Sequence, residues 1–291
     1  MYRYVLFVLG ALICEASFLS CMTSPTVVGI ALPHLIRRDE GRLLKTPGNA
    51  PLRLETGSYY VMYANAFIEG PAKMLPPDDY EERDVKLARA KQTYLRGVTI
   101  LREGLDRKYP GMSCAYASGK LDGYLERLTK DDVPAVYWMV AGTLAAYSLD
   151  PFDLDLGFKI PELAALMARA YKLDPDFNNG ALDDFYILFY GALPPALGGD
   201  REKAKKQFEI ALKKTNNNAA SPYISYVEAI AIPEQDRKKF DEYLDKALKV
   251  NLGAMKTAEE KLATKIAQKK ARFYQKNAER FVPLIDQSDE E

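Results

Sequence analysis

The sequence predicts an all-α protein, a helical-repeat solenoid of antiparallel helix pairs that ends in a long C-terminal helix. From residue 57 to residue 282, helix-length stretches are separated by clusters of Pro, Gly, Asn and Asp. Alternating β-branched runs joined by tight turns, which would indicate strands, are almost absent. Three of the helical stretches also end in similar residues, which indicates an internal repeat.

The first 21 residues have the features of an export signal. Arg3 precedes the apolar run Val5–Ile13, which is too short to span a bilayer but fits the hydrophobic region of a signal peptide. The segment Phe18-Leu-Ser-Cys21 follows, with a small residue before the cysteine as in a bacterial lipobox. We expect residues 1–20 to be a signal peptide and Cys21 to be the lipid-attachment site. Phe18 and Glu15 depart from the usual lipobox, so the alternative is an ordinary signal peptide.

The cysteine count agrees with lipid attachment. Cys14 lies in the expected signal peptide and Cys21 would carry lipid, so Cys114 remains alone and has no intramolecular disulfide partner. We expect Cys114 to be a small buried residue. Each buried CH₂ of an acyl chain contributes about 0.8 kcal/mol, so two or three chains would anchor the protein stably.

Residues 21–56 read as a lipidated tether and pre-domain stretch, because four prolines leave room for at most one short helix near 28–38. The helical domain follows at 57–282, then the acidic tail 283–291, of which Asp286–Glu291 is expected to be disordered. The helices that we expect are 57–73, 80–108, 114–129, 134–148, 160–173, 180–193, 201–214, 222–231, 236–250 and 255–281.

Some of these boundaries have a clear physical cause. Pro134, Pro161 and Pro222 fall in first turns, where a missing N–H costs nothing. Asp200 can cap the helix that begins at Arg201.

The repeat is visible at the ends of three helices, in Ala170-Tyr-Lys-Leu-Asp-Pro175, Ala211-Leu-Lys-Lys214 and Ala247-Leu-Lys-Val-Asn251. A period near 34 residues of paired helices is typical of TPR proteins, and the first ending matches the close of a TPR second helix. The residues seven and three positions before each alanine would pack this helix on its partner. These residues are Leu163 and Met167, Ala204 and Phe208, and Phe240 and Leu244.

The partner helix shows the pattern once, in Trp138-Met-Val-Ala-Gly142, where glycine would allow close approach of the helix pair. An earlier helix would pack through Ala90, Tyr94 and Gly97. Insertions at 150–159 and 194–199 make the repeat irregular, so a plain helical solenoid is the alternative to a TPR fold.

Aromatic residues gather on three of the expected helices. In a solenoid of paired helices, such residues can line a concave or pore-facing surface, and tyrosine offers a large apolar body with a polar tip. The alternative for each residue is the core of the repeat. The candidate ligand- or partner-binding residues are Tyr59, Tyr60, Tyr63, Tyr186, Phe189, Tyr190, Tyr223 and Tyr226.

Several functions are disfavoured. The 40 basic and 40 acidic residues cancel, which argues against nucleic-acid binding. The single histidine, His34, precedes the helical domain, so no catalytic Ser/His/Asp or Cys/His set can form there, and we expect no enzyme and no cofactor. Asp150, Asp153 and Asp155 could bind a cation, but they lack the glycine and terminal glutamate of a calcium loop, so we expect no metal site.

The chain resembles the T-component (TatT) lipoproteins of TPR-protein-associated TRAP transporters over residues 57–281. No single motif carries the resemblance; the order of the segments does. These segments are Phe18–Cys21, Ala170–Phe177, Asp183–Gly191, Pro194–Gly199, Ala204–Leu212 and Ala219–Tyr223.

The resemblance implies a periplasmic homotrimer, anchored to a membrane by lipid, with a central pore and apolar clefts. It also implies association with a periplasmic solute-binding protein, the P-component, and contact with a small hydrophobic or organic-acid ligand. A lipoprotein TPR scaffold for envelope protein assembly is the alternative function.

Overall fold

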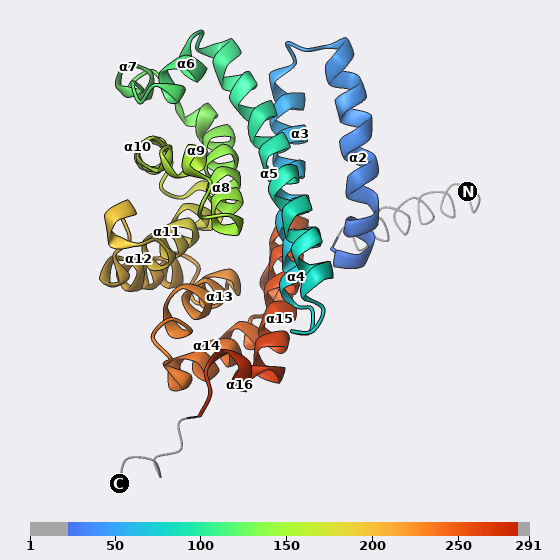
Figure 1. Ribbon diagram of the computed structural model, residues 1–291, viewed down its shortest axis with the longest axis vertical. Coiled ribbons are helices and arrows are strands. Elements are labelled where there is room, and N and C mark those ends of the chain that lie inside the picture. The colour runs from blue at the N-terminus through green and yellow to red at the C-terminus, as the bar shows by residue number, and fades with distance from the viewer. Residues whose placement is uncertain (1–22, 285–291) are drawn as a thin grey trace, which may run out of the picture. The chain divides into compact units, whose positions relative to one another are not determined.

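The computed structural model describes residues 23–284, and every regular element in this range is a helix (Figure 1). The expected signal peptide, Cys21 and nearly all of the acidic tail lie outside the described residues. The chain divides into two compact units, residues 32–214 and residues 23–31 with 215–284. The all-α prediction is therefore confirmed for the described part of the chain.

The helix α2 (Pro25–Lys45) begins in the smaller unit and continues into the larger one. The remaining helices of the larger unit are α3 (Ala50–Tyr63), α4 (Gly70–Lys73), α5 (Tyr80–Lys108), α6 (Met112–Ala117), α7 (Asp122–Leu125), α8 (Val133–Leu149), α9 (Leu154–Gly157), α10 (Ile160–Leu173), α11 (Ala181–Ala192) and α12 (Arg201–Lys214). The smaller unit contains α13 (Ser221–Tyr226), α14 (Arg237–Lys249), α15 (Ala258–Lys276) and α16 (Ala278–Phe281).

Two boundaries differ from the expectation at the N-terminal end. α2 is longer than the short helix expected near 28–38, and α3 begins at Ala50, well before residue 57. The Asn49 side chain accepts a hydrogen bond from the backbone N–H of Leu52 at 3.0 Å, and Pro51 lies in the first turn. This local cap explains the early start of α3.

The prediction of a single helix at 114–129 was wrong, because the chain forms α6 and α7 there with a break between them. Gly119 at the break has φ +67°, in the left-handed region that favours glycine. A Cβ atom at this position would lie 2.7 Å from the Oε1 atom of Glu162. The expected cap at Asp200 is confirmed, since its carboxylate accepts from the N–H of Lys203 at 3.0 Å.

The packing positions of the repeat are confirmed. Ala170, Ala211 and Ala247 are buried, and so are the six residues expected seven and three positions before them. α10 packs on α8, α12 on α11, and α14 on α13, each within one unit. Helix pairs are thus present, whereas their stacking as a TPR solenoid stays a prediction.

Glycines bring three helices of the larger unit close together, and Figure 1 shows α5 running beside α3 and α8. A Cβ atom on Gly97 of α5 would lie 2.7 Å from the carbonyl oxygen of Gly57 in α3. A Cβ atom on Gly142 of α8 would lie 2.8 Å from a methyl carbon of Val61. Gly142 therefore allows the close approach of α8 to α3 and α5, and not to α10, the partner expected from the sequence.

Two π-helical turns interrupt α-helical geometry. The first, Ala64–Glu69, joins α3 to α4, and the second, Val227–Ala231, follows α13. Glu69 accepts a hydrogen bond from the buried Tyr94 hydroxyl at 2.5 Å and pairs with the Lys73 ammonium at 2.6 Å. Burial, and then the nearby Glu69 carboxylate, raise the pKa of Tyr94. The second turn is also packed, since Val227 and Ile230 are fully buried.

Candidate interaction surfaces

The aromatic residues of α11 pack into a continuous cluster. Tyr186 and Phe189 are buried, whereas Tyr190 is half-buried. The rings of Tyr186 and Tyr190 stack with centroids 5.2 Å apart, and Tyr171 of α10 meets Tyr186 edge-on at 5.7 Å. The insertion at 194–199 covers part of this cluster, since a Cβ atom on Gly198 would lie 3.5 Å from the Phe189 ring. Tyr186 and Phe189 form packed core, and ligand contact by any of the three residues stays a prediction.

A buried carboxylate holds the helices around this cluster together. Asp183 of α11 has no exposed surface and pairs with the Lys214 ammonium of α12 at 2.8 Å. Its other oxygen accepts from the Tyr171 hydroxyl at 2.7 Å and from the Gln207 amide at 2.5 Å. Burial lowers the pKa of Lys214, but the Asp183 carboxylate outweighs it, so the net pKa is raised. Asp183 thus joins α10, α11 and α12 through its hydrogen bonds and ion pair.

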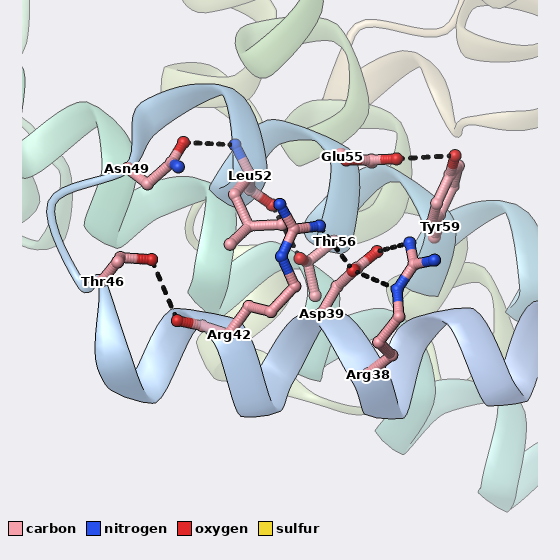
Figure 2. Close-up of polar contacts among 9 residues, drawn as sticks. All are labelled: Arg38, Asp39, Arg42, Thr46, Asn49, Leu52, Glu55, Thr56 and Tyr59. Carbon is pink, nitrogen blue, oxygen red and sulfur yellow. Dashed lines mark hydrogen bonds and ion pairs between the residues drawn. The ribbon is translucent and has the colours of Figure 1, made fainter.

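Tyr59 of α3 lies in a polar layer between α2 and α3, shown in Figure 2. Its hydroxyl donates to the Glu55 carboxylate at 3.0 Å, and burial together with this bond raises the pKa of Tyr59 to about 12. In the same layer Arg38 and Arg42 of α2 converge on the fully buried Asp39, at 3.0 and 3.1 Å. Each of these hydrogen bonds and ion pairs lies within one helix, and α2 acts on the Tyr59 hydroxyl through the charges of Asp39 and Arg38.

Tyr60 and Tyr63 are also half-buried on α3. Burial and the neighbouring Glu40 carboxylate raise the pKa of Tyr60 to about 12, while Tyr63 stacks on Phe67 with centroids 6.0 Å apart. The structure thus places Tyr59 and Tyr60 beside different carboxylates of the α2–α3 region.

Tyr223 and Tyr226 belong to the smaller unit, and both are buried. Both pack against Tyr243 of α14, with ring centroids 5.9 and 4.6 Å away. The eight candidate residues are therefore divided between the two units, and the structure does not test whether they meet a common ligand.

The insertion after α8 carries a surface that the sequence analysis missed. We call residues 150–158 the apolar loop. Phe152, Leu154 and Phe158 are 92%, 67% and 73% exposed in it. Charged residues lie between these apolar ones, so the pattern suggested only a loop with a candidate cation site.

The apolar loop is held in place by a lysine from a distant part of the chain. Lys91 of α5 places its ammonium 2.7 Å from carboxylate oxygens of both Asp150 and Asp153. Asp153 also caps α9 by accepting from the Leu156 N–H at 3.1 Å. The side-chain hydrogen bond from Lys91 lowers the pKa of Asp153. The charge that a cation would supply is thus provided by Lys91.

The remaining sequence expectations concern Cys114 and metal binding. Cys114 is exposed, so the expectation that it is buried was wrong. The short α6 directs Met112 and Tyr116 into the core, which leaves Cys114 on the opposite side. Among residues 23–284, no group of three or more His, Cys, Asp or Glu residues is placed to hold a metal ion. None of the helices in this range has the length and apolar character that a bilayer span needs.

Comparison with known proteins relates the whole described chain to one family. Residues 23–282 match the family described as TRAP transporter T-component. An uncharacterized protein of Treponema pallidum (strain Nichols) is 33% identical over 258 residues, which cover 88% of this chain and 79% of the relative. The chain therefore belongs to the TRAP transporter T-component family, which is a family of transporter components and not of enzymes.

Proposed function

We propose that this protein is the lipid-anchored T-component of a TRAP-type solute-uptake system, held at the membrane through Cys21 on the periplasmic side. The family match over residues 23–282 is the observation that carries the proposal. The signal-peptide and lipobox features of residues 1–21 support export and anchoring. In this role the protein forms a trimer and docks the solute-binding protein of the same transporter.

The apolar loop is the surface that we assign to docking the solute-binding protein. Large aromatic side chains dominate the binding energy of many protein interfaces, and Phe152 and Phe158 are 92% and 73% exposed. Lys91 holds the loop through two ion pairs, so its residues lose less conformational freedom when a partner binds. Both properties favour a protein partner.

Binding of the solute-binding protein to a Phe152→Ala, Phe158→Ala double variant tests this assignment. We expect affinity to fall by at least tenfold, or about 1.4 kcal/mol, as measured by isothermal titration calorimetry. Val85→Ala, at a position 71% exposed on α5, is the matched control and should bind as the parent does. Unchanged affinity in the double variant would contradict the assignment. A change in subunit number without a change in affinity would make the loop a contact between subunits.

We also propose that some of the aromatic residues contact a small hydrophobic or organic-acid ligand. Tyr190 is the better probe, because it is half-buried, whereas Tyr186 is in the core. Tyr190→Ala should weaken ligand binding with little loss of stability, while Tyr186→Ala should lower the melting temperature. If Tyr190→Ala lowers the melting temperature as much as Tyr186→Ala does, both are core residues.

A lipoprotein scaffold for envelope protein assembly is the alternative function. Affinity purification of the anchored protein from membranes distinguishes the two. Recovery of the solute-binding protein supports the transport role, and recovery of envelope-assembly proteins without it would contradict that role.

A further inference from the structure

The helix α2 has two faces of different character. Its inner face is buried at Val28, Leu32 and Ile36, which follow one another at four-residue spacing. At its start, the Thr23 hydroxyl accepts a hydrogen bond from Lys265 of α15 at 3.1 Å, within the smaller unit. These contacts fix which side of the helix points away from the protein.

The outer face of α2 combines apolar and basic residues. We define it by Val27, Ile30, Arg37, Leu44 and Lys45, all of them exposed and all within about 120° of one another around the helix. Ile30 is 66% and Leu44 is 86% exposed. Within residues 23–284, no other part of the protein covers these large apolar side chains.

The charge on this face has one sign. The outer face carries Arg37 and Lys45 and no acidic residue, while Arg38 and Arg42 pair with Asp39. The acids of the helix are turned elsewhere, because Asp39 is fully buried and Glu40 pairs with Arg96 of α5 at 3.0 Å. Exposed apolar residues beside a basic surplus are typical of helices that lie at the surface of an anionic membrane.

The position of α2 in the chain also favours contact with a membrane surface. Pro25, its first residue, follows Cys21 by four residues, and an extended chain spans at most about 3.6 Å per residue. Acyl chains on Cys21 would therefore hold the first turns of α2 within about 15 Å of the lipid headgroups.

We propose that the outer face of α2 lies on the membrane surface. Val27 and Ile30 then reach the boundary between the headgroups and the acyl chains, and Arg37 and Lys45 contact anionic headgroups. The proposal rests on the proposed function through its anchor at Cys21. It adds a second contact that orients the protein, because an acyl anchor alone leaves the protein free to rotate on its tether.

Fluorescence of the exported, processed protein in vesicles tests the proposal. The fluorescence of an Ile30→Trp variant is measured in vesicles of phosphatidylcholine with and without phosphatidylglycerol, using lipids brominated on their acyl chains as quenchers. The native Trp138 signal is subtracted. We expect strong quenching of Ile30→Trp in vesicles that contain phosphatidylglycerol and weaker quenching in vesicles of phosphatidylcholine alone. An Arg37→Glu, Lys45→Glu variant carrying the same reporter should lose the dependence on phosphatidylglycerol, and Lys249→Glu, an exposed site on α14, should keep it.

Mass spectrometry of the same preparation shows whether Cys21 is acylated and separates the two proposals. No quenching of Ile30→Trp in acylated protein overturns the membrane contact and leaves the anchor standing. Quenching with an unmodified Cys21 overturns the anchor and supports the membrane contact, and no quenching with an unmodified Cys21 overturns both. If Ile30→Asp changes the subunit number of the protein, the outer face of α2 is a contact with a second copy, and the proposal is wrong.

Discussion

Replacing Gly97 with alanine tests whether the close approach of α3 and α5 limits the stability of the larger unit. The new Cβ atom would lie 2.7 Å from the carbonyl oxygen of Gly57 and 2.8 Å from the Cβ atom of Tyr60. Both contacts are shorter than van der Waals distance, and both atoms are held by the α3 helix. One helix must therefore move.

Gly104 provides the matched control, because it lies on the same helix two turns later. An alanine there would have its nearest neighbour, the Cδ atom of Arg53, at an ordinary 3.6 Å. Either substitution gains about 1 kcal/mol of helix propensity, so this term cancels between the two variants. The remaining difference is the cost of overpacking at Gly97, about 1–3 kcal/mol.

Urea unfolding followed by far-UV circular dichroism measures this difference. We expect Gly104→Ala to unfold at a higher urea concentration than the parent and Gly97→Ala at a lower one than Gly104→Ala. Equal slopes of the transitions would show that the comparison concerns the native state. If Gly97→Ala is as stable as Gly104→Ala, the contact between the two helices is not tight, and the reasoning is refuted.

Three further predictions concern charged groups. Asp183→Asn should lower the free energy of unfolding, measured by urea titration, by about 2–3 kcal/mol. This is less than the cost of removing one partner of a fully buried ion pair, because Lys214 is 23% exposed and its ammonium can contact water. Burial alone would raise the pKa of Asp132, but the hydrogen bonds from Lys108 and neighbouring donors lower it below 3.8. The ionised Asp132 therefore stabilises the fold at neutral pH, and this contribution is lost as the pH falls through the pKa of the folded state. Thermal melts should show a shallower loss of stability on acidification in Asp132→Asn than in the parent. Lys91→Ala should speed proteolysis within the apolar loop while changing the melting temperature little, and equal cleavage rates would show that the ion pairs do not hold the loop.

The elements that local sequence specifies were predicted well. The bounds expected for α5 are the observed ones, because a long amphipathic stretch between turn residues leaves little choice. Residues such as Leu163, Phe208 and Leu244 are predicted as packing positions for a related reason, since helical periodicity determines which face of a helix packs, and they are buried. α3 begins earlier than expected because Asn49 caps it and Pro51 fits its first turn, so this proline starts a helix instead of preventing one.

The candidate sites depended on distant contacts, which the sequence pattern does not contain. The apolar loop is held by Lys91, which is 59 residues away from Asp150 in the chain. Likewise, Tyr186 became core because α10 brings Tyr171 against its ring. A tyrosine stripe on a helix has the same pattern whether a ligand or another helix covers it. For this reason the pattern could select the aromatic residues but not their role.

The π-helical turn at Ala64–Glu69 has a consequence for comparing members of this family. The N–H of Gly70 bonds to the carbonyl of Asn65, five residues earlier, so the turn holds one residue more than an α-helical path would. A relative that lacks this extra residue would be one position shorter here, yet its flanking helices could keep the same buried faces. A gapless alignment across residues 64–69 would then rotate every later position of that helix by about 100° and exchange buried residues for exposed ones.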